Sequence, residues 1–496
     1  MGADEGPMMG SEPSMNLPVD EEVLPDLSHV QSIHILGICG TAMGTFAGLL
    51  VQRGYNVTGS DAGVYPPMST QLEALGIALM DGYRAENLDH NPDLVIIGNV
   101  IRRNNPEATA VRQRQLLHTS FPRALGALFL EGRHPIVLAG THGKTTTTAI
   151  TAHLLHHAGL DPSFLVGGIP LNFGQSFRLG DGPHFVLEGD EYDTAYFDKV
   201  PKFKHYRPQT SVLTSVEFDH ADIYEDLAAV EKAFDLLTER TAANNGCLIA
   251  CHGDEGAQRL ERRAPQSLKR RPYLSSKGLD VDQIKVSDTG YHLALKRSGR
   301  FIGDLLVPMY GRHNVANALA AYEVAASVGL KHDEIAAGMA CFQGVKRRME
   351  RRGHQKDILV FDDFAHHPTA VKTTLEGVRE RHPKQRILAI FEPRSATSCR
   401  KVFQQPYLEA FDPADLVWIA ANARAAELPE DQRFLPEDLV AQLNERGADA
   451  HFGVDVAQIV DDVGREAKKN DLIIVMSNGG FGGIHQKILD RLAEGA

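Results

Sequence analysis

The stretch "PIVLAGTHGKTTTTAITAHLLHHAG", residues 135–159, decides the fold of the middle of the chain. It reads as a buried apolar strand, a turn containing Gly140 and Gly143, and a helical pattern that stops near Gly159. Glycines let the backbone N–H groups of such a turn converge on phosphate oxygens, and the helix N-terminus adds partial positive charge. The stretch therefore predicts a phosphate-binding loop.

The two side chains that follow Gly143 indicate a nucleoside triphosphate as the ligand. Lys144 can reach the β and γ phosphates, and the hydroxyl of Thr145 can bind magnesium. The common pattern G-x-x-x-x-G-K-[ST] has a glycine where this chain has Leu138, so we expect a tighter loop. The plainer alternative is a glycine turn before a buried helix, with Lys144 on the surface.

Acidic residues follow the next two apolar runs. "FVLEGDEYD" ends in Glu188, Asp190, Glu191 and Asp193, and "SVLTSVEFDH" ends in Glu217, Asp219 and His220. The carboxyl ends of parallel strands line one crevice, and magnesium prefers oxygen ligands. These clusters therefore predict a metal and nucleotide site facing the phosphate loop. The alternative is that each cluster is a solvated turn.

Apolar runs without polar alternation recur along the chain, as in "IHILG", "LVIIG", "ILAIFEP" and "LIIVMS". Such runs are typical of parallel strands covered by helices on both faces, so the fold class is α/β. Three apolar runs fall in the block that begins at residue 32. We expect a flexible extension (1–31), a Rossmann-like domain (32–120), a central P-loop ATPase with a mainly parallel sheet (121–345) and a C-terminal Rossmann-like domain (346–496).

Composition narrows the classes of partner and compartment. Acidic residues outnumber basic ones by 64 to 51, so we expect no general attraction for nucleic acid or anionic lipid. No run reaches about 18 apolar residues, and residues 1–31 lack the basic start and apolar core of a signal peptide. The five cysteines are scattered, which favours reduced thiols in the cytoplasm. No obligate protein partner is evident.

A second glycine loop, "IHILGICGTAMG", begins at Ile33. It departs from the dinucleotide pattern G-x-G-x-x-G, because Cys39 stands two positions after Gly37. A helix N-terminus with small residues still suits an anionic diphosphate. Asp61, after the next strand, can either bond a ribose or cap a turn. An NAD-dependent oxidoreductase is therefore a remote alternative, although it leaves the phosphate loop and both acidic clusters unexplained.

Six motifs in this order resemble those of the Mur ligases: "GTHGKT", "EGDEYD", "EFDH", "GRHNVANALAA", "RRME" and "DDFAHHP". The resemblance runs from about residue 32 to the C-terminus. These ATP-dependent enzymes form amide bonds in cell-wall precursors. The resemblance implies a UDP-sugar domain, a central ATPase and a domain for the incoming amine, with ATP and Mg²⁺ as cofactors.

The resemblance also implies roles for individual residues. Lys144, Glu188 and His220 would be catalytic, and Thr145, Glu188 and His220 would hold magnesium. Nucleotide contacts would come from Gly140, Thr141, His142, Gly143, Lys144, Thr145, Thr146, His313, Asn314, Asn317, Arg348 and Asp363. UDP-sugar contacts would come from Gly37, Cys39, Gly40, Thr41, Met43, Ser60 and Asp61.

Within the family, "GICGTAMG" and "DDFAHHP" are most similar to the branch that acts on UDP-N-acetylmuramate. "YPPMST", "FEPRSATS" and "MSNGGFGGIHQK" are similar to the members that add the recycled murein tripeptide L-alanyl-γ-D-glutamyl-meso-diaminopimelate through an acyl phosphate. Members that add L-alanine usually carry Pro-His-Arg where this chain has Pro393-Arg394-Ser395. The alternatives are the L-alanine ligase and a non-catalytic nucleotide-sensing switch.

The peptide would be bound by residues of the C-terminal domain. Arginine can pair with a carboxylate through two hydrogen bonds, and the glycines of "SNGGFGG" permit close backbone approach. The expected peptide-binding residues are His366, Arg394, Ser395 and Asn478.

Overall fold

The computed structural model describes residues 27–65, 68–218, 223–395, 398–422 and 425–494. Most of the expected extension 1–31 lies outside these residues, as do Asp219 and His220. The chain divides into two compact units, Met1–Gly132 with Asp193–Tyr206, and Arg133–Tyr192 with Arg207–Ala496. No helix in the described part of the chain has both the length and the apolar character needed to cross a bilayer.

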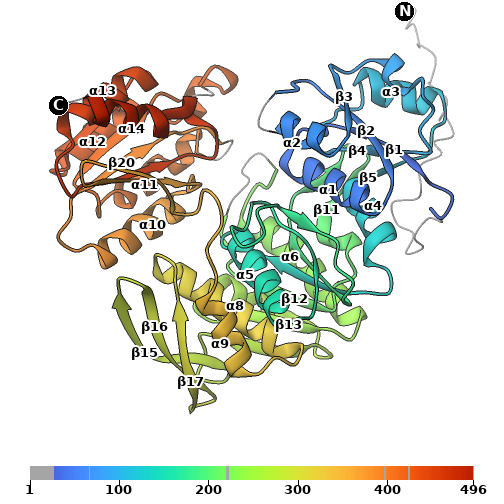
Figure 1. Cartoon of the computed structure of the whole chain (residues 1–496), viewed down its shortest axis with the longest axis horizontal. Coiled ribbons are helices and arrows are strands. Elements are labelled where there is room, and N and C mark those ends of the chain that lie inside the picture. The colour runs from blue at the N-terminus through green and yellow to red at the C-terminus, as the bar shows by residue number, and fades with distance from the viewer. Residues whose placement is uncertain (1–26, 66–67, 219–222, 396–397, 423–424, 495–496) are drawn as a thin grey trace, which may run out of the picture. The chain divides into compact units, whose positions relative to one another are not determined.

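The first unit is built around a parallel sheet with strand order β3-β2-β1-β4-β5 (Figure 1). Its strands are β1 (Ser32–Leu36), β2 (Asn56–Asp61), β3 (Ala78–Asp81), β4 (Leu94–Ile97) and β5 (His118–Ser120). Its helices are α1 (Thr41–Gln52), α2 (Met68–Ala74), α3 (Pro106–Gln113), α4 (Phe121–Leu125), η1 (Ala85–Leu88) and η2 (Gly126–Leu130). The three expected strands are β1, β2 and β4. Strands β3 and β5 are short and partly polar, so no apolar run reveals them.

A small antiparallel hairpin also belongs to the first unit. It consists of β10 (Asp193–Ala195) and β11 (Asp198–Pro201), followed by η3 (Lys202–His205). Its turn residues Tyr196 and Phe197 pack on the core of this unit, and Arg112 donates a hydrogen bond to Tyr196 at 2.9 Å. The sequence had placed this segment in the central domain, because local pattern does not show which core two aromatic residues join. The domain boundaries stay a prediction.

The second unit contains a ten-stranded sheet with order β17-β16-β15-β14-β13-β12-β6-β9-β7-β8. The strands are β6 (His134–Ala139), β7 (Ser163–Leu165), β8 (Phe177–Arg178), β9 (His184–Gly189), β12 (Thr210–Leu213), β13 (Cys247–Cys251), β14 (Lys269–Tyr273), β15 (Leu279–Ser287), β16 (Gly290–Arg297) and β17 (Arg300–Val307). Pairing is parallel in the middle and antiparallel at both ends of the sheet. Because β9, β6 and β12 are neighbours and parallel, their carboxyl ends share one edge.

Two groups of helices cover this sheet. Helices α5 (Lys144–His157), α8 (Arg312–Ser327) and α9 (His332–Ala340) contact one another, and α6 (Leu227–Ala243) contacts α7 (Glu255–Arg263). All four residues of β12 are buried, so the central strands are covered on both faces. Packing against α8 holds α5, the helix that follows the phosphate loop, in place.

The second unit also contains a six-stranded sheet with order β18-β19-β23-β20-β21-β22 (Figure 1). Its strands are β18 (Glu350–Gln355), β19 (Ile358–Asp363), β20 (Ile387–Phe391), β21 (Leu416–Ala420), β22 (Ala450–Gly453) and β23 (Leu472–Met476). Its helices are α10 (Pro368–Arg381), α11 (Gln404–Ala410), α12 (Pro436–Glu445), α13 (Val456–Glu466) and α14 (Ile484–Glu494), with η4 (Lys401–Phe403), η5 (Ala425–Glu427), η6 (Glu430–Gln432) and η7 (Phe481–Gly483).

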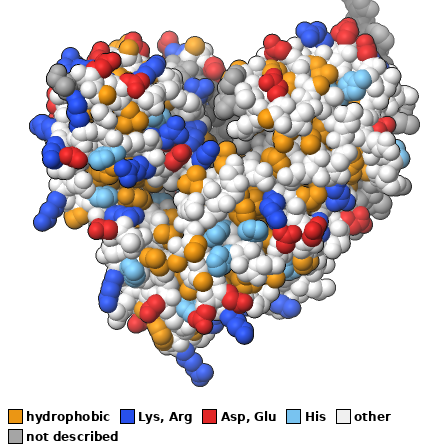
Figure 2. Space-filling model, viewed as in Figure 1, with side chains coloured by type: hydrophobic (Ala, Val, Ile, Leu, Met, Phe, Trp, Pro, Cys, Tyr) orange, Lys and Arg blue, Asp and Glu red, His pale blue; other side chains and the backbone are white. Residues whose placement is uncertain are grey.

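Alternate residues of β20 enter two different cores. Ile387, Ala389 and Phe391 pack with residues of α10, α11 and α12, whereas Leu388 and Ile390 pack with residues of α13 and α14. A strand whose two faces are both buried has no polar alternation, which is why "ILAIF" reads as one apolar run. The fold is therefore α/β with three domains and mainly parallel sheets, as predicted. On the face shown in Figure 2, acidic and basic side chains of the described residues are interspersed.

Candidate active site

The phosphate loop joins β6 to α5, and two glycines give it its shape. Gly140 has φ +134° and Gly143 has φ +83°, conformations that favour glycine. A Cβ on Gly140 would lie 2.2 Å from Thr214 Oγ1, and one on Gly143 would lie 2.2 Å from Asn317 Oδ1. The loop therefore packs closely against both the chain that follows β12 and helix α8, which leaves no room for a side chain at Gly140 or Gly143.

Lys144, the first residue of α5, is almost enclosed. Its Nζ donates to Gly140 O at 2.6 Å and lies 3.2 Å from Glu191 Oε2, and the Glu191 side chain is only 2% exposed. Burial alone would lower the pKa of Lys144, but the carboxylates of Glu191 and Asp190 outweigh burial and raise it. The lysine therefore stays charged, and its charge is held at the mouth of the phosphate loop.

Thr145 and Glu188 meet at the carboxyl edge of the sheet. Thr145 Oγ1 donates to Glu188 Oε2 at 3.1 Å, and Gly167 N donates to Glu188 Oε1 at 2.5 Å. Burial, with Asp190 nearby, raises the pKa of Glu188. A carboxylate beside a hydroxyl is an oxygen pair that suits a hard divalent cation. His220, the third expected metal ligand, lies outside the described residues.

A second group of side chains that could hold a metal ion lies in this region, and the sequence did not predict that its members come together. The ligand atoms of His142, Glu217 and His367 all lie within 4.8 Å of one another. Glu217 is already engaged, because it accepts a hydrogen bond from Thr369 Oγ1 at 2.9 Å and lies 3.3 Å from His142 Nε2. The histidine pair of "DDFAHHP" was the available signal, but only the fold brings His367 to the phosphate loop. This group is a contact between the loop and the N-terminus of α10.

Helix α8 places three expected nucleotide-binding residues beside the loop. Asn317 Nδ2 donates to Asn314 Oδ1 at 2.9 Å, and Thr147 Oγ1 donates to Asn317 Oδ1 at 3.3 Å. Burial, with Arg348 and His142 nearby, lowers the pKa of His313 to about 4, so its ring is neutral at pH 7. The Nδ1 atom of His313 is buried and has no hydrogen-bond partner among the described residues. The neutral His313 ring is thus suited to a hydrogen bond with an uncharged nucleotide base.

One cavity of about 390 Å³ brings these elements together. Arg348, which precedes β18, and Asp363, the last residue of β19, also line it. Asp363 accepts hydrogen bonds from Met349 N and Ala365 N, both at 2.8 Å. The expected residues that line the cavity are Thr141, His142, Gly143, Lys144, Thr145, Thr146, His313, Asn314, Asn317, Arg348, Asp363 and His366. His366 therefore lies with the nucleotide group, and a role for it in peptide binding stays a prediction.

The other expected peptide-binding residues lie around the loop that follows β23. Arg394 packs so closely on this loop that a Cβ on Gly479 would lie 2.5 Å from Arg394 Cδ. Its guanidinium lies 3.7 Å from Glu392 and is half exposed. Ser395 Oγ bonds to Ser398 Oγ at 2.9 Å. Asn478 has a buried Oδ1 with no hydrogen-bond partner among the described residues. Arg394 thus supplies a cation beside the loop, and Asn478 supplies a hydrogen-bond acceptor within it.

The glycine loop of the first unit is braced by Asp61. Asp61 Oδ2 accepts a hydrogen bond from Cys39 N at 2.9 Å, and the N–H of Gly37 donates to Ser60 O at 2.8 Å. Ser60 Oγ in turn bonds to the buried Glu107. Burial, with Asp61 nearby, raises the pKa of the Cys39 thiol to about 11. Asp61 thus holds the glycine loop, and a bond from Asp61 to a ribose stays a prediction.

The loop leads directly into α1 of the first unit. Gly40 caps this helix, and Thr41 and Met43 stand in its first turn. The expected UDP-sugar residues thus gather at a single helix N-terminus. Contact with the sugar nucleotide stays a prediction.

Three protein-family domains match the chain: "Mur ligase family, catalytic domain" over residues 32–133, "Mur ligase middle domain" over 138–325 and "Mur ligase, glutamate ligase domain" over 347–479. The chain is 39% identical over 466 residues to the UDP-N-acetylmuramate–L-alanyl-gamma-D-glutamyl-meso-2,6-diaminoheptandioate ligase of Haemophilus influenzae, covering 93% of the chain and 99% of the relative. It is 40% identical over 476 residues to the Escherichia coli protein of the same name, covering 94% and 99%. The crystal structure of a murein peptide ligase from Psychrobacter arcticus has a TM-score of 0.69 at 35% identity, covering 94% and 99%.

Proposed function

Because the chain belongs to the Mur ligase family of ATP-dependent amide-forming ligases, we propose that it joins UDP-N-acetylmuramate to the recycled murein tripeptide. The observation that carries the proposal is the single cavity in which the phosphate loop, α8 and the Arg348–Asp363 segment meet. The names of the two relatives support the choice of substrates. The oxidoreductase alternative is set aside, since the family consists of ligases. We also propose that the protein acts in the cytoplasm.

The chemistry must overcome an unreactive carboxylate. The lactyl carboxylate of UDP-N-acetylmuramate takes the γ-phosphoryl group of ATP, which releases ADP and leaves an acyl phosphate. The free amine of the tripeptide then attacks the carbonyl carbon, and phosphate departs. Protein catalysis of phosphoryl transfer consists mainly of positioning and charge neutralisation. The proposed site therefore needs fixed cations and donors around the phosphates more than it needs an acid or base.

The residues of the chain divide this work. Lys144 places a positive charge beside the phosphate loop, and the N-terminus of α5, which begins at this residue, adds its partial positive charge. Thr145 and Glu188 would hold Mg²⁺, which neutralises charge on the phosphates when bound. The neutral ring of His313 would bind the base, and Arg348 would supply a second cation in the same cavity.

The choice of amine is tested by offering UDP-N-acetylmuramate and ATP with the tripeptide, with L-alanine or with no amine. Released phosphate gives the rate, and the mass of the product shows the new amide. We expect kcat/KM to be larger for the tripeptide than for L-alanine. Faster turnover of L-alanine would identify the alternative ligase. Nucleotide binding without any product would identify the non-catalytic switch.

Arg394→Ala is expected to raise the KM for the tripeptide about 10- to 100-fold, with little change in the KM for ATP. The guanidinium is half exposed beside the loop after β23, where it can pair with a carboxylate of the peptide, and hydrogen bonds to charged groups contribute about 1.5–3 kcal/mol. The measurement is initial-rate kinetics with each substrate varied in turn. Arg465→Ala on α13 is the control, because that arginine is exposed and pairs only locally with Asp462. An unchanged tripeptide KM would exclude this role for Arg394.

A further inference from the structure

Arg347 and Arg348 are neighbours in the segment that enters the six-stranded sheet, yet their side chains serve different places. Arg348 lines the nucleotide cavity. Arg347 reaches the loop that follows β23. Both guanidinium groups also lie against the ring of Phe364, at 5.2 and 4.9 Å from its centroid. This short segment therefore contacts both the proposed nucleotide site and the proposed peptide site.

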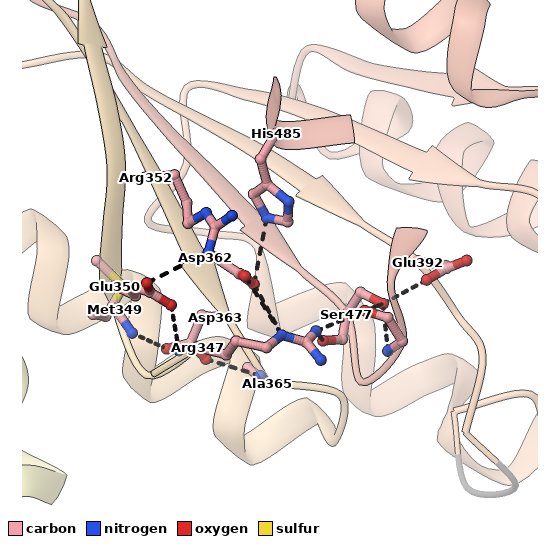
Figure 3. Close-up of polar contacts among 11 residues, drawn as sticks. Arg347, Met349, Glu350, Arg352, Asp362, Asp363, Ala365, Glu392, Ser477 and His485 are labelled. Carbon is pink, nitrogen blue, oxygen red and sulfur yellow. Dashed lines mark hydrogen bonds and ion pairs between the residues drawn. The ribbon is translucent and has the colours of Figure 1, made fainter. Parts of the chain in front are cut away.

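The guanidinium of Arg347 holds two carbonyl groups of the loop at once. Its Nη2 donates to Ser477 O at 2.6 Å and to Gly479 O at 2.7 Å (Figure 3). Its Nε faces Asp362 at 3.4 Å. A planar guanidinium can serve several acceptors in fixed directions, which an ammonium group cannot do with the same geometry. The loop therefore bends around Arg347.

Arg347 is itself anchored from behind. Asp362 is 5% exposed and also lies 3.3 Å from His485 Nε2 (Figure 3). Burial would raise the pKa of Asp362, but His485 and Arg347 outweigh burial and hold the pKa below its usual value. The carboxylate is therefore charged near neutral pH and fixes the guanidinium that it faces.

The backbone of Arg347 is fixed as well. Its φ is +60°, a left-handed value that costs a residue other than glycine about 1 kcal/mol or more. Its N–H donates to Glu350 Oε2 at 2.9 Å, and its carbonyl accepts from Phe364 N at 2.8 Å. These bonds hold the strained conformation and set the direction in which the side chain leaves the backbone.

The loop that Arg347 holds carries the groups expected to meet the peptide. Asn478 stands between the two bound carbonyls, and its buried Oδ1 has no hydrogen-bond partner among the described residues. A buried acceptor without a hydrogen bond lowers the stability of the fold unless a ligand supplies a donor. Ser477 Oγ accepts from Gly479 N at 2.9 Å and donates to the carboxylate of Glu392, which in turn faces Arg394.

We propose that Arg347 is a positioning residue for the amine substrate: it sets the peptide site by fixing Ser477, Asn478 and Gly479, and it touches no substrate itself. The proposal rests on the proposed function, since it assumes that this loop binds the peptide. It also makes the segment that carries Arg348 a physical connection between the nucleotide site and the peptide site.

The test is initial-rate kinetics of Arg347→Ala and Arg347→Lys. We expect the KM for the tripeptide to rise about tenfold or more in both, with changes below about twofold in the KM for ATP and for UDP-N-acetylmuramate. Lysine keeps the charge but not the planar fork, so it should not restore binding. Arg352→Ala is the matched control, because Arg352 lies on β18, is 43% exposed and pairs with Glu350 at 3.4 Å.

Hydrogen exchange supplies a readout that does not depend on turnover. In Arg347→Ala, the amides of residues 477–480 should exchange faster, while those of β6 and α5 keep the wild-type rate. An unchanged tripeptide KM, an equal rise in all three KM values, or an unaltered loop exchange rate would overturn the role of Arg347. A wrong proposed function would give a different result, because the wild-type protein would then form no amide with the tripeptide. The hydrogen exchange of the loop would still show whether Arg347 holds it in place.

Discussion

Lys144→Ala is expected to lower kcat about 10³-fold while leaving the affinity for UDP-N-acetylmuramate nearly unchanged. The reason is that Lys144 is a buried, permanently charged group at the phosphate loop, and removal of one fixed donor to developing charge costs about 10²–10³-fold or more. Released phosphate gives kcat, and calorimetry gives the affinity for the sugar nucleotide. Normal turnover in this variant would refute the assignment of the loop.

A loss of stability must be separated from this loss of catalysis. Lys144→Ala removes the cation that lies 3.2 Å from the buried carboxylate of Glu191, and breaking a buried ion pair costs about 3–5 kcal/mol. The double variant Lys144→Ala with Glu191→Gln removes both charges and should recover most of the thermal stability. It should remain inactive. Lys232→Ala, an exposed position on α6, controls for the loss of any lysine.

Glu188→Gln is expected to weaken binding of the divalent ion by about 100-fold or more and to lower kcat in parallel. Loss of a group that merely supports a metal ligand costs about 10–100-fold, and Glu188 is proposed as a direct ligand with Thr145. Glutamine keeps an oxygen that can accept the hydrogen bond from Gly167 N, so the loop should hold its shape. Titration with Mn²⁺ in the presence of a non-hydrolysable ATP analogue measures the affinity.

The group formed by His142, Glu217 and His367 provides the comparison. Glu217→Gln changes a carboxylate that lines the nucleotide cavity, but Glu217 already bonds to Thr369 and faces His142. We expect its effect on Mn²⁺ affinity to be much smaller than that of Glu188→Gln. If Glu217→Gln abolished ion binding and Glu188→Gln did not, the ion would belong to the histidine group and the assignment to Thr145 and Glu188 would be wrong.

Much of the fold could be predicted, because a strand that is buried on both faces appears in the sequence as a continuous apolar run. The runs at β4, β6, β9, β20 and β23 are largely apolar without alternation, and each is a buried parallel strand. The stretch that becomes β15, β16 and β17 was not recognised as a sheet, because these antiparallel strands are partly exposed and mix charged with apolar residues. The local sequence pattern predicts a strand well only where all residues of the strand are equally buried.

The residues of the candidate site also fall into those that the sequence could bring together and those that it could not. Gly143, Lys144 and Thr145 are adjacent in sequence, so a strand, a turn and a helix suffice to bring them together. The approach of His367 to His142 and the reach of Arg347 to Gly479 join segments far apart in the chain. No spacing rule predicts such contacts, since they depend on how whole sheets pack.

The sequence by itself determined the class of the fold, the phosphate loop and the acidic ends of the strands beside it, because each depends on neighbours within a few residues. Only the tertiary structure decided that Asp61 at the end of β2 holds the glycine loop at Cys39, that the hairpin with Tyr196 joins the first unit, and that Arg347 connects the segment of Arg348 to the loop of Asn478. The physical reason is that a hydrogen bond or a packed ring needs a partner in space, and chain order does not specify which partner arrives.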